Sequence, residues 1–135
     1  MRITADTNLL VRVATGDDPG QAEAARNAMA AAELVAVTLP ALCEFCWVLR
    51  VGYGFKPPQI AASLRLLAAS GNVAMDRDAV EAGLATLELG GDFADSVIAF
   101  EGKWLGAETF ATFDKQAAQL IEAQGGSARL LTADA

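Results

Sequence analysis

The stretch RITADTNLLVR, residues 2–12, decides the fold. Its first four residues favour a short strand, which ends at an aspartate, Asp6. An apolar pattern with helical period follows, from Thr7 to Thr15. A strand that leads directly into a helix is typical of α/β proteins, whose central strands are buried. The stretch therefore predicts a carboxylate at the carboxyl end of a buried strand.

The rest of the chain alternates strands and helices. Strands are expected in RITA (2–5), LVAVT (34–38), NVAM (72–75), ETFATF (108–113) and ARLL (128–131). Helices are expected over 7–15, 21–32, 41–51, 59–69, 77–89, 93–105 and 114–123. This alternation predicts an α/β fold, a three-layer α/β/α sandwich with a mainly parallel sheet of four or five strands. The length favours one domain over residues 1–135.

Composition restricts the chemistry. The chain has 135 residues, of which 53% are apolar, and it contains no histidine. Catalysis by Ser-His-Asp or Cys-His groups and metal binding by imidazole are therefore excluded, which leaves carboxylates. The net charge of −7 argues against non-specific nucleic-acid binding and favours a metal or a basic partner. Neither a signal peptide nor an apolar run of about 18 residues is present, so we expect a cytoplasmic protein and no membrane partner.

Two other features of the sequence favour a structural role. Cys43 and Cys46 have CxxC spacing, but two cysteines cannot complete a four-ligand zinc site, so buried reduced thiols are expected. Trp47 and Trp104 lie on apolar helical stripes and are expected in the core.

Acidic residues recur where strands end and helices begin. Asp6 and Asp114 each follow a predicted strand, and they share one sheet edge if those strands are parallel neighbours. Glu44 lies in the otherwise apolar PALCEFCWVLRV, close to the loop after LVAVT. In GGDFADSVIAF, one of Asp92 and Asp95 is expected to cap a helix and the other to project from its first turn.

Each of these acids could also have a separate structural role, as a helix cap, a turn residue or one member of an ion pair. Together they indicate more. Two carboxylates about 4 Å apart repel by roughly 4 kcal/mol at an effective dielectric of 20, so a convergent cluster requires a cation. Oxygen ligands select hard ions such as Mg²⁺ or Mn²⁺. Such ions activate water and neutralise phosphate charge in phosphodiester chemistry.

The segments ADTNLLVR, PALCEFCWVLR, DFADSVIAFEG and TFATFDKQAAQL together resemble the PIN-domain ribonucleases, above all the VapC toxins of type II toxin–antitoxin systems. The resemblance implies an endoribonuclease that uses Mg²⁺ or Mn²⁺ and leaves a 3′-hydroxyl. It assigns the catalytic and metal-ligand positions to Asp6, Glu44, Asp95 and Asp114. Supporting polar positions are Thr7, Asn8, Asp92 and Thr112.

The same resemblance implies partners. It predicts an RNA substrate, a cognate VapB-like antitoxin with a basic segment, and a homodimer for which Trp47 and Trp104 are candidate interface residues. Basic side chains that could line an RNA groove, or be ordinary surface charges, are Arg12, Arg50, Lys56, Lys103 and Lys115.

Three alternatives stay open. A receiver-like acidic binding module would need a phosphoacceptor such as Asp76 or Asp78, but the acidic pair expected after its first strand is missing. A PIN fold without catalysis would only bind RNA or a partner. A DNA nuclease could use the same metal chemistry, although the chain lacks basic insertions for holding a duplex.

Overall fold

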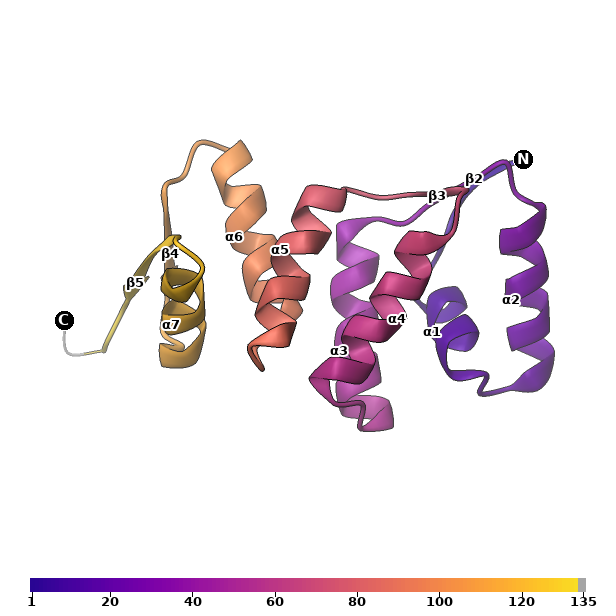
Figure 1. Ribbon diagram of the computed structural model, residues 1–135, viewed down its shortest axis with the longest axis horizontal. Coiled ribbons are helices and arrows are strands. Elements are labelled where there is room, and N and C mark those ends of the chain that lie inside the picture. Colours follow the sequence, from indigo (N-terminus) through magenta and orange to yellow (C-terminus); the bar gives the residue numbers. More distant parts are fainter. Residues whose placement is uncertain (134–135) are drawn as a thin grey trace. The chain divides into compact units, whose positions relative to one another are not determined.

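The computed structural model describes residues 1–133, which form an α/β fold of alternating strands and helices (Figure 1). The strands are β1 (Arg2–Thr4), β2 (Leu34–Ala36), β3 (Val73–Ala74), β4 (Thr109–Thr112) and β5 (Ser127–Leu130). The helices are α1 (Thr7–Thr15), α2 (Pro19–Ala31), α3 (Leu39–Tyr53), α4 (Pro57–Ala69), α5 (Arg77–Glu88), α6 (Phe93–Trp104) and α7 (Lys115–Ala123). All elements predicted from the sequence are therefore present, with boundaries that differ by a few residues.

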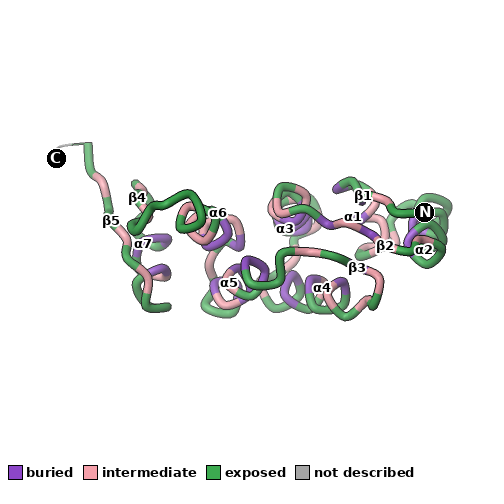
Figure 2. The backbone as a smooth tube through the Cα atoms, turned by 90° about the horizontal axis from the view of Figure 1, so that it is seen from above, coloured by how far each residue is buried: buried purple, intermediate pink, exposed green. Residues whose placement is uncertain are grey.

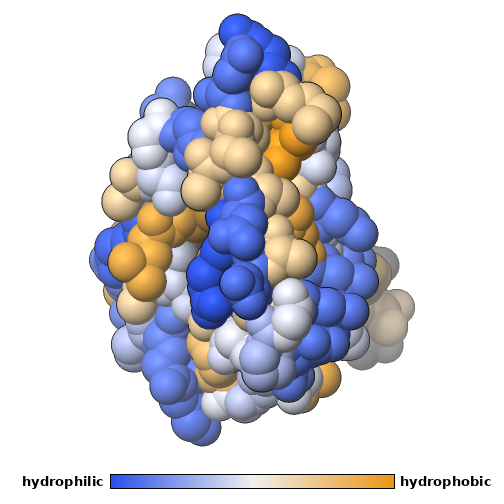
Figure 3. Space-filling view, turned by 90° about the vertical axis from the view of Figure 1, so that its right-hand side faces the viewer, coloured by the Kyte–Doolittle hydropathy of each residue, from blue (hydrophilic) through white to orange (hydrophobic). Residues whose placement is uncertain are grey.

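The chain divides into two compact units, unit 1 over Met1–Arg77 and unit 2 over Asp78–Ala135. In unit 1 the sheet has the order β1-β2-β3, and all of its pairs are parallel. The core of this unit contains fully buried side chains from β2, α3 and α4, namely Val35, Leu42, Leu49 and Leu64. The face of the molecule on the side of the alanine-rich α2 shows apolar and hydrophilic areas side by side (Figure 3).

Unit 2 contains a parallel pair of strands, β4 and β5, whose register joins Thr109 to Ser127. Helices α5 and α6 are joined through Gly90 and Gly91, and Phe93 at the start of α6 is fully buried. A Cβ at Gly83 would overlap the ring of Phe93, so α5 requires a glycine there. Along each helix buried residues alternate with exposed ones, as expected for helices that pack one face (Figure 2).

The number of strands and their parallel direction agree with the sequence prediction. The pairing of the strands differs from the prediction. One sheet of four or five strands was expected, but the strands of the described residues form two sheets, β1-β2-β3 and β4-β5. Alternating apolar patterns identify strands, whereas the pairing of strands depends on contacts that the pattern does not contain.

The expectation that both tryptophans are core residues was wrong. Trp47 is 57% exposed and Trp104 is 79% exposed. The buried stripe of α3 consists of Leu42, Phe45, Cys46 and Leu49, and Trp47 lies outside it. Trp104 is the last residue of α6, past the buried part of that helix. Of the two cysteines, Cys46 is buried as predicted and Cys43 is half-buried.

Candidate functional site

Asp6 lies directly after β1 and caps α1. Its backbone is extended, with φ −77° and ψ 158°, and its carboxylate Oδ1 accepts a hydrogen bond of 2.8 Å from the Thr7 N–H. Aspartate is a preferred N-cap because its carboxylate satisfies an otherwise unpaired helix N–H and favours the positive end of the helix dipole. The residue is exposed, so the carboxylate lies at the surface at the carboxyl end of the strand, as the sequence predicts.

Glu44 lies in the second turn of α3 and is exposed, although most of its neighbours in sequence are apolar. Together with Asp6 it lines a cavity of about 380 Å³ at the carboxyl ends of β1 and β2. The complete lining consists of Thr4, Ala5, Asp6, Thr7, Thr38, Pro40, Ala41 and Glu44. Parallel strands end at the same sheet edge, and this explains why residues so far apart in the sequence surround one cavity.

Sequence reasoning missed two threonines of this cavity, Thr4 and Thr38. Thr38 is the N-cap of α3, and its Oγ1 accepts a hydrogen bond of 3.4 Å from the Ala41 N–H. A threonine shortly before a proline is a recognisable helix start, because proline is favoured in the first helical turn. The sequence alone therefore contained a signal for Thr38, whereas Thr4 reads only as a strand residue.

In unit 2, Asp92 and Asp95 divide their roles as predicted. Asp92 is the N-cap of α6, and its Oδ1 accepts a hydrogen bond of 3.1 Å from the Ala94 N–H. Asp95 lies in the first turn of the helix and is half-buried. Asp95 therefore lies at the positive end of a helix dipole, where a carboxylate is favoured.

Asp114 has the corresponding position on α7. Its Oδ1 accepts a hydrogen bond of 3.1 Å from the Ala117 N–H, and its own N–H donates to the Thr112 hydroxyl at 3.0 Å. Helix α6 precedes β4 and α7 follows it (Figure 1), and the end of α7 that lies near the start of α6 is its C-terminal end, because Ser96 and Gln124 both bind Thr86. Asp95 lies in the first turn of α6, and Asp114 lies directly before the first turn of α7.

The other polar positions that the sequence singled out have different surroundings. Thr7, the residue after Asp6, is buried, whereas Asn8 is exposed. Thr112 touches the backbone of Asp114 through its hydroxyl, as described above. Contacts of this kind hold a carboxylate in place without binding anything themselves.

The donors around the cavity of unit 1 fit a hard divalent cation. Two acidic residues and three threonines line it, and the oxygen atoms of such residues match the preference of Mg²⁺ and Mn²⁺. Within residues 1–133, however, no group of three or more His, Cys, Asp or Glu side chains is arranged to hold an ion. Asp6 and Asp114 would share one sheet edge if β1 and β4 were neighbouring strands, but these two strands belong to different sheets. The convergence of all four acids thus stays a prediction.

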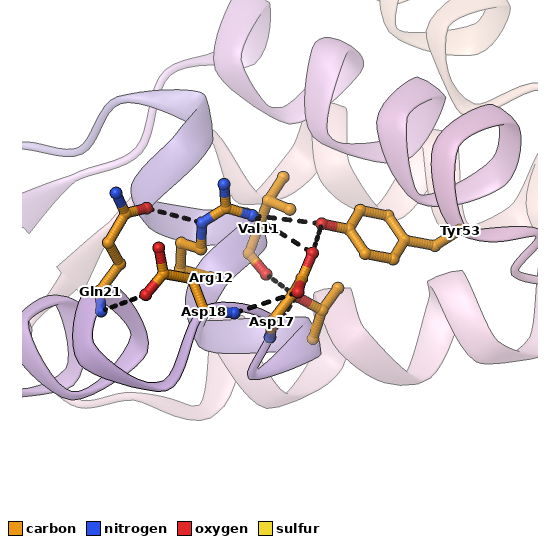
Figure 4. Close-up of polar contacts among 7 residues, drawn as sticks. Val11, Arg12, Asp17, Asp18, Gln21 and Tyr53 are labelled. Atoms are coloured by element: carbon orange, nitrogen blue, oxygen red, sulfur yellow. Dashed lines mark hydrogen bonds and ion pairs between the residues drawn. The ribbon is translucent and has the colours of Figure 1, made fainter.

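Arg12 was a candidate for an RNA groove, but its side chain is held in a local network (Figure 4). Its Nε donates to Gln21 Oε1 at 2.8 Å, and its Nη1 donates to the Tyr53 hydroxyl at 3.2 Å. The Tyr53 hydroxyl donates in turn to Asp17 Oδ2 at 2.9 Å, and Arg12 also pairs with Asp17. This network connects α1 with α2 and the end of α3, which indicates a structural role. The remaining candidates, Arg50, Lys56, Lys103 and Lys115, are exposed.

The chain belongs to the PIN domain family, whose model matches residues 3–122. The match includes all four candidate acids and extends over both units. PIN domains are generally nucleases and usually depend on divalent metal ions, so membership supports a hydrolase and excludes a receiver module.

A search of curated proteins found no match to this chain. None of the helices in the described part of the chain has the length and apolar character needed to span a bilayer.

Proposed function

We propose that this chain is a Mg²⁺- or Mn²⁺-dependent endoribonuclease, the toxin of a VapBC-type toxin–antitoxin pair that acts in the cytoplasm. The observation that carries the proposal is the cavity shared by Asp6 and Glu44 at the carboxyl end of β1, in a chain that the PIN family model matches over residues 3–122. A protein without histidine needs another source of nucleophile activation, and carboxylate-held metal supplies one.

The proposed ligands are Asp6, Glu44, Asp95 and Asp114, contributed by a single PIN-like domain of residues 1–135. Support for one domain comes from the family match, which continues across the boundary between the two units. Support for the ligands comes from their positions at the ends of strands or the starts of helices. Helix caps use one carboxylate oxygen at Asp6 and Asp114, so the second oxygen of each can serve a cation.

In the proposed reaction, water adds to the phosphorus of an RNA phosphodiester and the bond to the 3′-oxygen breaks, so that this oxygen leaves with a proton. The bound divalent ion would activate the water and neutralise charge on the phosphate. Asp6 and Asp95 would be the main ligands, Glu44 would bind the ion or orient the water, and Asp114 would complete a weaker position.

The products test this reaction. Single-stranded RNA cleaved by the wild-type chain should carry 5′-phosphate and 3′-hydroxyl ends, and EDTA should stop cleavage. A 2′-deoxyribose at the cleavage site should still allow cleavage, because water and not the 2′-hydroxyl attacks. Cyclic phosphate ends or activity in EDTA would contradict the mechanism. Cleavage of flap DNA in preference to RNA would favour a DNA nuclease, and binding of RNA without cleavage would favour an inactive PIN fold.

The proposed partners are a VapB-like antitoxin and a second copy of this chain. The net charge of −7 suits an antitoxin with a basic segment, whose association should be faster at low salt because opposite charges steer the encounter. An association rate that does not depend on salt would indicate an apolar contact. A short neighbouring reading frame that encodes a DNA-binding protein with a basic tail would support the toxin assignment.

A further inference from the structure

Three polar side chains are buried in the part of the chain that the structure describes, namely Thr7 (6% exposed), Thr86 (1%) and Ser96 (4%). Thr7 directly follows Asp6, and Ser96 directly follows Asp95. Thr86 is not next to a candidate ligand in sequence, but its hydroxyl forms a hydrogen bond with the Ser96 hydroxyl. Because burying a polar group without a partner is costly, this contact satisfies both hydroxyls and links α5 to the start of α6.

Thr86 also connects these two helices with α7. Its hydroxyl accepts a hydrogen bond of 2.8 Å from Gln124 Nε2, and the same amide donates to the Leu120 carbonyl at 2.9 Å. Since a hydroxyl can donate one hydrogen bond while it accepts another, Thr86 can bind Ser96 and Gln124 at once. The Thr86 carbonyl accepts a further bond of 2.9 Å from the Gly91 N–H, in the turn before α6.

The backbone of this turn packs closely against side chains of α5 and α7. A Cβ at Gly91 would overlap the side chain of Leu120 and would lie 2.6 Å from Thr86 Cγ2. The next residue, Asp92, caps α6, and Asp95 follows in its first turn. The segment that carries Asp95 is thus fixed at both ends, by Gly91 against Thr86 and by Ser96 against the same residue.

We infer that Thr86 and Gln124 are positioning residues, which fix the start of α6, and with it Asp95, against the C-terminal end of α7, the helix that begins after Asp114. The inference rests on the proposed function, in which both aspartates are metal ligands. Neither positioning residue would touch the ion. Side chains that hydrogen-bond directly to metal ligands typically change metal affinity by about 10–100-fold when they are removed, and we expect the lower end of this range because Thr86 acts through the backbone of α6.

The main variant is Thr86→Val, which replaces the hydroxyl by a methyl group of similar size. In the full-length chain we expect Mn²⁺ affinity, measured from the electron paramagnetic resonance signal of free Mn²⁺, to fall about tenfold. Amide hydrogen exchange at the start of α6 should become faster even without metal, because the link to α5 is lost. Thr86→Ser keeps the hydroxyl and should restore both properties.

Two further variants separate positioning from stability. Thr86→Val/Ser96→Ala removes both hydroxyls, so no buried polar group loses its partner and most of the stability should return. Mn²⁺ affinity should nevertheless stay low. Gln124→Ala removes the other hydrogen bond of Thr86 and should also weaken Mn²⁺ binding. Because Gln124 is exposed, this substitution leaves no cavity in the core.

The matched control is Thr109→Val, which breaks another threonine–serine hydroxyl pair of unit 2, between Thr109 and Ser127 at 3.0 Å. This pair lies at the start of β4, whereas Asp114 follows the end of that strand. Its Mn²⁺ affinity should equal that of the wild type.

Wild-type Mn²⁺ affinity and wild-type exchange in Thr86→Val would overturn the inference. An equal loss of affinity in Thr109→Val would overturn it as well, because the effect would then not be specific to this network. If the double variant regained affinity together with stability, Thr86 would have only a structural role. Failure of the wild-type chain itself to bind Mn²⁺ or to cleave RNA would instead refute the proposed function, and this inference with it.

Discussion

The two units hold their acidic residues by different means. In unit 1, Asp6 and Glu44 line a cavity at the ends of two paired strands, so the sheet itself determines their positions. In unit 2, Asp95 and Asp114 lie in or directly before the first turns of helices, and buried hydroxyls connect those helices. The comparison teaches that acids of the same proposed role depend on sheet register in one unit and on helix packing in the other.

The glycines of the two units show the same difference. In unit 1, a Cβ built on any glycine would come no closer than 3.7 Å to a neighbouring atom. In unit 2, a Cβ would overlap a side chain at Gly83 and Gly91, and it would lie 2.9 Å from Ile121 Cγ2 at Gly126. At these three positions unit 2 therefore has less space for an added methyl group than unit 1 has at Gly20 and Gly52.

The largest expected effect is that of Asp6→Asn on RNA cleavage. A bound metal contributes several kcal/mol to such reactions, and each 1.4 kcal/mol is a factor of ten, so cleavage should fall by roughly 1,000-fold. Asparagine caps helices as well as aspartate does, so α1 should stay folded. Without metal, the melting temperature should equal or exceed that of the wild type, because one negative charge leaves a cavity that also contains Glu44.

The control for this variant is Glu33→Gln in the same unit. Glu33 is an exposed carboxylate that lies 3.8 Å from the N-terminal amine and is not part of the cavity. Its substitution should leave cleavage unchanged. Equal activity of Asp6→Asn and Glu33→Gln would show that Asp6 is not essential to the site.

The next largest effect is on stability, and it compares a glycine-to-alanine change in each unit. Gly91→Ala should lower the free energy of unfolding by about 1–3 kcal/mol, since overpacking forces neighbouring side chains to move. The matched change in unit 1 is Gly20→Ala, where the nearest atom, Asp18 Oδ1, would lie 3.8 Å from the new Cβ. This change should be neutral or stabilising by up to about 1 kcal/mol, because alanine restricts the unfolded chain. Urea denaturation measures both, and similar values for the two variants would contradict the difference in packing.

The smallest effect concerns the Arg12 network of unit 1. Tyr53→Phe keeps the edge-to-face contact with Phe55, whose ring centroid is 6.4 Å away, but removes the hydroxyl that joins Arg12 and Asp17. We expect a loss of about 0.5–1.5 kcal/mol in unfolding free energy and no change in RNA cleavage. A raised KM for RNA would instead support Arg12 as a groove residue.

The sequence predicted the elements of the fold well because its signals are local. Alternation of apolar runs with Gly and Pro breaks located the helices and strands, and capping preference predicted that one of Asp92 and Asp95 caps a helix while the other lies in its first turn. For Asp6 and Glu44, the rule that parallel strands end at one edge was sufficient to place them near each other.

Features that depend on three-dimensional packing could not be predicted in this way. Trp47 was placed in the core because its neighbours are apolar, yet the buried stripe of α3 lies on other residues. The pairing of strands into two sheets was not visible either. Thr86 had no signal at all, because its partners Ser96 and Gln124 are distant in sequence and meet only when three helices pack together.

The proposed function assigns Asp6 and Asp95 as ligands of the same ion, and Mn²⁺ titration of four proteins tests this assignment most directly. The proteins are the wild type, Asp6→Asn, Asp95→Asn and the double variant. We predict one high-affinity class of site in the wild type, weakened about 1,000-fold by either single change, because a close carboxylate–cation attraction of roughly 4 kcal/mol is lost. The double variant should show no additional class of site. The contradicting result would be a site of wild-type affinity in Asp6→Asn that is lost in Asp95→Asn. The two aspartates would then bind different ions.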